Sequence, residues 1–377
     1  MSKKLVVLLI VFSAMLSIIT YEGNCQNKLI DISEKWGDSG NYPLSKLGSS
    51  VRYIKLETTP SVMIGPAYKF QYKIIRDTIY ITSEGSPMYV FNPSGKYVRQ
   101  IGTVGRGPRE FIKISSYAID YNKGQVWISD RQQGKILIYS LSGEFISEFR
   151  NTAGSYKLFS NSMGGVSMFY RSYLIEENIN KVYSFGNNSA YIDSIQLYTV
   201  QDLKEHRRSV ALSTISLIKS RLHIIEKPSL QEYILQDRSW IPSWKFISNG
   251  GEIIKIRQSE THFFIHSANP YAAQFIAEKG SGEAFKCSFA VDASGPDAVG
   301  AYNDLDGGLP FWPKHITDEG DLVCMYESYD LVSYAMGQSS SYGGKPPKMT
   351  EAFKEFVGQL AVDDNPVIAI VSTVDKN

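Results

Sequence analysis

The stretch of sequence that decides the fold reads Ile79-Tyr80-Ile81-Thr82-Ser83, then Met88-Tyr89-Val90-Phe91-Asn92, the turn Pro93-Ser94-Gly95, and Lys96-Tyr97-Val98-Arg99-Gln100-Ile101. A second stretch of the same kind reads Val126-Trp127-Ile128-Ser129-Asp130, Ile136-Leu137-Ile138-Tyr139-Ser140, the turn Ser142-Gly143, and Glu144-Phe145-Ile146-Ser147-Glu148-Phe149. Val126 lies 47 residues after Ile79, and Gly143 lies 48 residues after Gly95. Short alternating apolar runs separated by Gly, Pro, Ser and Asn predict β-strands joined by tight turns.

Each copy becomes a four-stranded unit when the preceding strands, residues 69–75 and 114–121, are added. A four-stranded unit that repeats every roughly 40–50 residues indicates one blade of a β-propeller. A small twisted sheet leaves both faces open, whereas blades in a ring bury each face against the next and leave few open edges. Residues 51–377 would give six blades about 54 residues each, and seven blades of 47 also fit. We therefore predict an all-β propeller with four-stranded antiparallel blades.

The later units of the chain are less regular. We expect further strand pairs at residues 181–185 with 190–197, at 232–235 with 244–248, and at 285–291 with 322–328. The alternative of two separate β-sandwich domains has no linker to support it.

The two ends of the repeat region suggest how the ring closes. Residues 51–57 form a strand ahead of the first complete unit, and residues 366–371 form a strand at the C-terminus. Pairing these strands in one blade would close the ring. Residues 348–360 place Phe353, Phe356, Val357 and Leu360 at helical spacing, which predicts a short helix before the last strand.

The N-terminus has the pattern of an export signal. Lys3 and Lys4 precede an uncharged, mostly apolar run at residues 5–19, which is short for a membrane-spanning helix. We predict a signal peptide at residues 1–25, a lead-in segment at 26–50 and one propeller domain at 51–377. A retained anchor and a lipid on Cys25 are the alternatives. We expect the exported chain, with no transmembrane span, in the periplasm, at the outer membrane or outside the cell.

Charge and cysteine content exclude several classes of protein. The 377 residues include 39 basic and 38 acidic side chains, and removing residues 1–25 leaves 37 of each. A neutral chain lacks the excess of Lys and Arg that nucleic-acid binding requires. Apart from Cys25 only Cys287 and Cys324 occur, so the protein is not a disulfide scaffold. The two could be neighbours in one sheet, and we favour buried, unpaired thiols.

Part of the sequence resembles a known repeat. Residues 90–102, continuing into Gly105-Arg106-Gly107-Pro108-Arg109-Glu110-Phe111, look like the NHL-type repeat of six-bladed β-propeller proteins exported by Bacteroidetes. Residues 227–233 resemble a middle blade, and residues 364–368 resemble the terminal strand of that family. The resemblance implies six blades rather than seven, and it implies no established reaction. Arg109 stands where the usual repeat has a glycine.

The best candidate site is one mouth of the predicted ring. Gly102, Gly105 and Gly107 follow a strand, but Pro108 and a further strand replace the helix that a phosphate-binding loop needs, so we interpret this segment as a turn between blades. Such a turn lies on the same rim as the loops at residues 84–87 and 130–134. The candidate binding residues are therefore Glu84, Arg106, Arg109, Glu110, Asp130 and Arg131. Solvated charge on a turn is the simpler explanation for them.

Metal sites have little support in the sequence. His262 and His266 flank an apparent strand about 13 Å apart, too far to share one metal without bending. The stretch 303–308 resembles a calcium loop, with Asp304 and Asp306 as weak candidate ligands, but position 313 is Pro where such a loop has Glu. We predict no cofactor, and calcium is the one metal that the sequence leaves open.

Two functions fit these observations. The first, which we favour, is a monomeric, non-enzymatic binding or interaction module whose aromatic and arginine side chains contact a glycan, a peptide or a cell-envelope protein. The 24 tyrosines and Trp127, Trp240, Trp244 and Trp312 support it weakly, because aromatic residues also fill blade interfaces. The second is a metal-dependent lyase or hydrolase with its site in the central channel.

Overall fold

The computed structural model describes most of the predicted propeller domain and part of the lead-in segment. The described ranges are 28–35, 42–64, 71–83, 85–150, 155–160, 165–171, 180–185, 191–196, 214–219, 221–226, 229–236, 239–249, 253–267, 273–287, 300–338 and 346–373. The predicted signal peptide, with Cys25, and Glu84 of the predicted mouth lie outside these ranges. No helix within them is long and apolar enough to cross a membrane.

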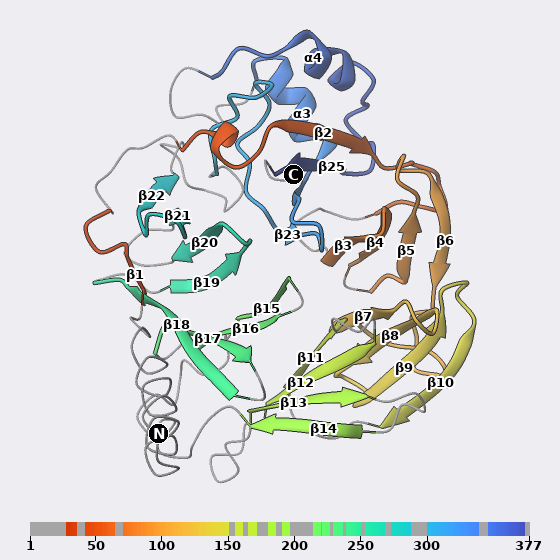
Figure 1. The fold of residues 1–377 in the computed structure, drawn as a ribbon. Coiled ribbons are helices and arrows are strands. Elements are labelled where there is room, and N and C mark those ends of the chain that lie inside the picture. Colours follow the sequence, from red (N-terminus) through yellow and green to blue (C-terminus); the bar gives the residue numbers. More distant parts are fainter. Residues whose placement is uncertain are drawn as a thin grey trace, which may run out of the picture.

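The described strands form six small sheets arranged around a common centre (Figure 1). The first two are β3 (Gln71–Ile75), β4 (Thr78–Thr82), β5 (Met88–Phe91) and β6 (Tyr97–Ile101), and β7 (Ser116–Asp120), β8 (Gln125–Asp130), β9 (Lys135–Ser140) and β10 (Phe145–Arg150). The third is β11 (Ser155–Ser160), β12 (Val166–Arg171), β13 (Asn180–Phe185) and β14 (Tyr191–Gln196). Within each of these sheets neighbouring strands are antiparallel.

The remaining sheets complete the arrangement. The fourth contains β15 (Thr214–Ile218), β16 (Arg221–Glu226), β17 (Gln231–Gln236) and β18 (Ser239–Ile247), with β1 (Lys28–Asp31) added in parallel to β18. The fifth contains β19 (Ile253–Gln258), β20 (His262–Ser267), β21 (Ala273–Glu278) and β22 (Ala284–Cys287). The sixth contains β23 (His315–Ile316), β24 (Leu322–Tyr326), β25 (Val367–Ser372) and β2 (Ser50–Lys55). The prediction of an all-β propeller is confirmed.

The first two sheets pack face to face, as the repeat predicts. Met88 and Val90 from β5 share one apolar cluster with Val126 and Ile128 from β8, and Phe111 from the connecting turn lies in the same cluster. All five side chains are buried. Burying an aromatic side chain such as Phe111 contributes roughly 2–3 kcal/mol, so this contact is a substantial part of the stability.

The two predicted end strands pair with each other. β2 runs antiparallel to β25, with Tyr53 opposite Ala369, so the last sheet combines residues from both ends of the described chain. The lead-in segment is also built into the fold, because β1 extends the fourth sheet and Pro43 bridges to Tyr302.

Two predictions about the C-terminal half are wrong. The predicted pairing of residues 285–291 with 322–328 does not occur in the described part of these ranges, since β22 belongs to the fifth sheet and β24 to the sixth. Cys287 and Cys324 therefore lie in different sheets, although both side chains belong to one apolar cluster between them. Both side chains are buried and neither forms a disulfide, as we favoured.

The two α-helices of the described residues lie against the last sheet. The predicted helix is present as α4 (Glu351–Val357), where the Thr350 side chain accepts a hydrogen bond from the Phe353 backbone N–H. A second helix, α3 (Ser328–Ala335), was not predicted, and it shares an apolar cluster with α4. Tyr53 from β2 stacks on Phe356, with ring centroids 5.2 Å apart, which holds α4 against the sheet.

Candidate functional site

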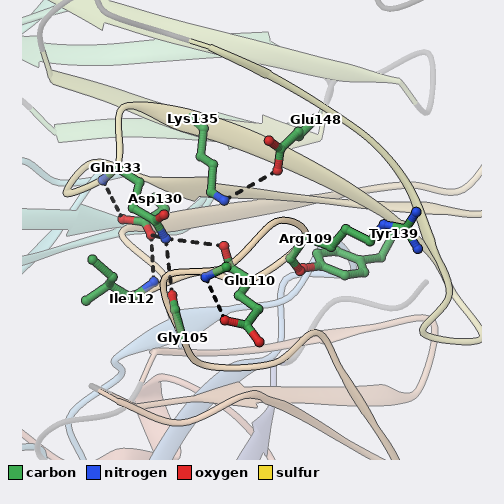
Figure 2. Close-up of polar contacts among 10 residues, drawn as sticks. Gly105, Arg109, Glu110, Ile112, Asp130, Gln133, Lys135, Tyr139 and Glu148 are labelled. Carbon is green, nitrogen blue, oxygen red and sulfur yellow. Dashed lines mark hydrogen bonds and ion pairs between the residues drawn. The ribbon is translucent and has the colours of Figure 1, made fainter.

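The predicted mouth residues lie on two neighbouring turns. Arg106, Arg109 and Glu110 belong to the turn from β6 to β7, and Asp130 and Arg131 lie where β8 leads into β9. Figure 2 shows Arg109, Glu110 and Asp130 on these turns. The two turns are in direct contact, because Asp130 accepts a hydrogen bond from the backbone of residue 112. The name β6–β7 turn is used below for residues 102–115.

Asp130 is fully buried and serves as a structural anchor. One carboxylate oxygen accepts hydrogen bonds from the backbone N–H of Ile112, at 2.7 Å, and from the side-chain amide of Gln133, at 2.9 Å. The other oxygen accepts from the backbone N–H groups of Gln132, at 2.9 Å, and Gln133, at 3.2 Å. Four donors compensate this buried charge, so the carboxylate has little capacity left for a ligand.

Glu110 also holds the turn together. Its carboxylate accepts a hydrogen bond from the Gly107 backbone N–H at 2.8 Å and lies directly over Gly105. A Cβ atom at Gly105 would come within 2.0 Å of that carboxylate, so a larger residue there would displace the Glu110 side chain from the turn. The side-chain amide of Gln133 donates to the backbone carbonyls of Gly105, at 3.3 Å, and Glu110, at 3.2 Å.

Arg109 has a left-handed backbone conformation, with φ of 65°. Glycine is the residue that adopts this conformation without strain, which explains the glycine expected here from the repeat. The hydroxyl of Tyr139 donates to the Arg109 carbonyl at 2.7 Å, and the guanidinium lies 5.3 Å from the centre of the Phe145 ring. The strained backbone is therefore held in place by the neighbouring sheet.

The structure thus separates the predicted site into two groups. Asp130 and Glu110 are used to fix the turns, whereas the side chains of Arg106, Arg109 and Arg131 are exposed. Glu84 lies outside the described residues. Sequence reasoning missed Gln133 and Tyr139, which supply the bonds that fix the turns; the only available signal was the position of Gln133 within a predicted loop.

The weak calcium candidates are engaged in hydrogen bonds. Asp304 accepts from the backbone N–H and the hydroxyl of Ser45, at 2.9 and 2.6 Å. Asp306 accepts from the Gly308 backbone at 2.9 Å and from the Tyr53 hydroxyl at 3.3 Å, and burial raises its pKa. Among the described residues no three His, Cys, Asp or Glu side chains gather closely enough to hold a metal ion.

A polar cluster with an enzyme-like composition anchors the lead-in segment. The Tyr42 hydroxyl donates to Glu278 at 3.0 Å and lies 3.1 Å from His262 Nε2. The other ring nitrogen of His262 lies 2.8 Å from the Thr261 hydroxyl, and burial lowers the pKa of this histidine. Because Tyr42 gives its hydrogen to Glu278, His262 must donate from Nε2, so every polar group here has a structural partner. His266 lies at the other end of β20.

Comparison with known families identifies the family of this chain. The model of a family described as "Domain of unknown function (DUF4934)" matches residues 27–249, more than half of the chain. The chain belongs to this family. No curated protein matches the sequence of this chain.

Solved structures with the same fold include a Bacteroides fragilis protein described as "Putative exported protein". Its sequence is 17% identical to this chain, and the two structures superpose with a TM-score of 0.69. The match covers 92% of this chain and 100% of the Bacteroides fragilis protein. Virginiamycin B lyase from Staphylococcus aureus gives a TM-score of 0.42 at 13% identity, over 66% of this chain and 76% of the lyase. The β-propeller domain of Cps50 (Swd1) from Myceliophthora thermophila gives 0.40 at 15% identity, over 63% and 71%. The first match supports the propeller fold, and the other two are too distant to support more.

Proposed function

We propose that this protein is an exported, non-enzymatic binding module built on a six-bladed β-propeller of NHL-type repeats. The blade number is supported by the six sheets of the described residues and by the pairing of β2 with β25. Export is supported by Lys3, Lys4 and the apolar run that follows them, and by the description of the Bacteroides fragilis protein.

The observation that carries the proposal is the exposure of Arg106, Arg109 and Arg131 on turns whose backbone is fixed. Rigid turns that present exposed side chains bind with little loss of conformational entropy. Arg109 retains a long charged side chain at a position where glycine would be less strained. Such a residue is more readily explained by a contact with a partner than by folding. The partner is a glycan, a peptide or a cell-envelope protein that offers acceptors to arginine, and the module acts as a monomer without a cofactor.

The alternative is a metal-dependent lyase or hydrolase with its site in the central channel. The innermost strands that would line such a channel carry Lys73, Lys157, Lys255 and Arg257. Positive charges at the centre of the ring repel a divalent cation, so the binding module is the better supported function.

The test is binding of the purified protein to glycan and peptide arrays and to cell-envelope extracts from which captured proteins are identified. We expect a ligand whose affinity falls at least about tenfold when Arg106→Ala, Arg131→Ala and Arg109→Gly are combined, since each arginine contact contributes on the order of 1 kcal/mol. The matched control is Arg52→Ala, because Arg52 is equally exposed but lies on β2. A ligand that binds the triple variant as tightly as the wild type would place the site elsewhere.

A further inference from the structure

Four basic side chains lie on the innermost strands of three different sheets. Lys73 belongs to β3, Lys157 to β11, and Lys255 and Arg257 to β19. Each of these strands is the terminal strand of its sheet, and together with β7, β15 and β23 they face the middle of the ring (Figure 1). Lys255 and Arg257 are two residues apart on one strand and therefore share a face.

Hydrogen bonds hold two of these ammonium groups between neighbouring inner strands. Lys73 donates to the backbone carbonyl of Tyr117 on β7 at 2.7 Å, and its Nζ lies 4.4 Å from the centre of the Tyr117 ring. Lys157 donates to the backbone carbonyl of Ile215 on β15 at 3.2 Å. Each lysine uses one of its three donors in this way, which fixes its position and leaves the other donors for a ligand.

The charges of this group act on one another. Burial, with the nearby charge of Lys157, lowers the pKa of Lys73 to about 7. Burial, followed by the charges of Arg257, Lys157 and Lys314, lowers the pKa of Lys255 to about 8. The pKa values of Lys157 and Arg257 are also lowered, mainly by burial. The basic residues of β3, β11 and β19 thus form one electrostatic cluster, called the central basic cluster below.

The two histidines near the cluster add no charge to it. His315 on β23 has its pKa lowered to about 3 by burial and by Lys73, so this imidazole is neutral at physiological pH. Burial and the charges of Arg257 and Lys255 lower the pKa of His266 as well. The neutral ring of His266 can donate a hydrogen bond to a ligand without adding charge, whereas the Nε2–H of His315 faces the Ile74 backbone carbonyl at 3.5 Å.

No acidic side chain that the structure describes forms an ion pair with the cluster. Within the described ranges no carboxylate forms an ion pair with Lys73, Lys157, Lys255 or Arg257. The Asp318 carboxylate attracts Lys73, but this carboxylate is exposed. It also attracts Arg76, and the nearby charge of Glu319 repels it. The protein as a whole is close to formally neutral, yet these four basic side chains place positive charge at its centre. Positive charge that protein encloses, and that no opposite charge compensates, destabilises the fold.

The cluster is enclosed but still reached by solvent. The side chains of Lys157 and Lys255 are exposed to water, although protein atoms around them are close enough to lower their pKa values. A group that is accessible and partly desolvated interacts more strongly with an ion of opposite charge than a group on the open surface.

We propose that the centre of the ring is a binding site for an anion that carries at least two negative charges on carboxylate, phosphate or sulfate oxygens. The Arg257 guanidinium offers two parallel N–H donors that match such a group, and Lys73, Lys157 and Lys255 neutralise it from three sides. The ligand is either a free organic or inorganic anion or an acidic sugar of a glycan. The four basic residues of this site are not among the arginines that carry the proposed function, so the site goes beyond that function and stands without it.

The direct test is isothermal titration calorimetry of the purified protein at pH 6.5 and low salt with inorganic phosphate, citrate and trigalacturonate. Maltotriose is the neutral control. We expect saturable binding of at least one of the three anions, weakened at least about tenfold by Arg257→Gln and by Lys255→Gln and unchanged by Arg52→Gln. Preference for phosphate or citrate identifies a free anion, and preference for trigalacturonate identifies an acidic glycan. Absence of saturation by all three up to about 10 mM would overturn the proposal.

A second readout needs no variant and therefore does not depend on whether Arg257→Gln folds. Titration at pH 7.5 in two buffers of different ionisation enthalpy measures the protons taken up on binding. Citrate and trigalacturonate are used here, because inorganic phosphate itself exchanges a proton near this pH. Because Lys73 and Lys255 are only partly protonated at that pH, an anion beside them must raise their proton occupancy. Net proton uptake supports the site, and binding without uptake places the anion away from the cluster and overturns it.

Discussion

Charged side chains have opposite roles in the β6–β7 turn and at the centre of the ring. At the turn the buried carboxylate of Asp130 accepts four hydrogen bonds, and Glu110 caps a backbone N–H. At the centre Lys73, Lys157 and Arg257 share space with like charges and meet no paired carboxylate among the described residues. The charged groups at the turn form hydrogen bonds that stabilise the fold, whereas the charges at the centre are available to a ligand.

This contrast gives a physical criterion for separating structural from functional charge. A buried charge with a full set of donors stabilises its surroundings, and its removal leaves those donors unsatisfied. An enclosed charge among like charges destabilises the fold until a ligand neutralises it. The two regions should therefore respond to substitution with opposite signs.

The largest effect is expected at Asp130. Asp130→Ala would leave the backbone N–H groups of Ile112, Gln132 and Gln133 without their acceptor, so the free energy of unfolding should fall by about 3 kcal/mol, as measured by urea denaturation. Arg131→Ala, next to it in sequence but exposed, should change the free energy by less than about 0.5 kcal/mol. Equal effects of the two substitutions would contradict the anchor role of Asp130.

Gly102 gives the next largest effect at the turn. It has φ of 76°, and a Cβ atom there would come within 2.4 Å of the buried Phe111 ring. Gly102→Ala should lower the free energy of unfolding by about 2–3 kcal/mol through backbone strain and overpacking. Gly124 has φ of 62° with open space around its Cβ position, so Gly124→Ala should cost only about 1 kcal/mol in thermal or urea unfolding. If both variants lost the same stability, contact with Phe111 would not explain the glycine.

At the centre the sign should reverse. Lys157→Met removes one of the mutually repelling charges and keeps the length of the side chain. The free energy of unfolding of the ligand-free protein should rise by about 0.5–1 kcal/mol, while citrate or phosphate binding weakens. Lys348→Met, at an exposed position outside the cluster, is the matched control for a lysine replaced by methionine. Destabilisation by Lys157→Met beyond that of the control would show that the bond to Ile215 outweighs the repulsion.

The centre should also make stability depend on pH. The unfolded chain keeps protons on Lys73 and Lys255 up to their ordinary pKa of 10.5, whereas the folded protein releases them near pH 7 and 8. The folded state therefore binds fewer protons between about pH 7 and 9.5, so the free energy of unfolding should rise with pH in this window. Lys279, with a pKa lowered to about 8, contributes in the same direction from outside the cluster.

Urea denaturation between pH 6.5 and 9.5 measures this rise. Lys255→Met should make the rise smaller and leave the parts due to Lys73 and Lys279. An unchanged pH profile in Lys255→Met would mean that Lys255 keeps its ordinary pKa in the folded protein.

The regular part of the fold could be predicted because its spacing repeats. The strands at Ile79 and Val126 recur with constant turns, so local alternation and period point to the same four-stranded unit. The parallel pairing of β1 with β18 could not be predicted, since the four residues of β1 carry no pattern that selects a partner. The error at Cys287 and Cys324 has a similar cause: two apolar strands close in sequence were assigned to one sheet, although they face each other from adjacent sheets.

The candidate site was predicted in position but not in role. A charged residue after a strand, such as Asp130, is usually solvated, and only the packing of the β6–β7 turn against it makes it a buried anchor. The central basic cluster was missed because Lys73, Lys157 and Arg257 each occupy a polar position in an amphipathic strand, which indicates an exposed side chain. Only closure of the ring brings strands from different repeats together and encloses these charges.

The smallest predicted effect concerns Arg109 and separates backbone strain from side-chain contacts. Arg109→Ala and Arg109→Gly both remove the guanidinium that lies over Phe145, but only glycine relieves the strain of φ at 65°. The glycine variant should therefore be more stable than the alanine variant by about 0.5–1 kcal/mol, and close to the wild type, in paired urea denaturation experiments. Equal stabilities would mean that the bond from Tyr139 already compensates the conformation, and the strain argument for a binding role of Arg109 would then fail.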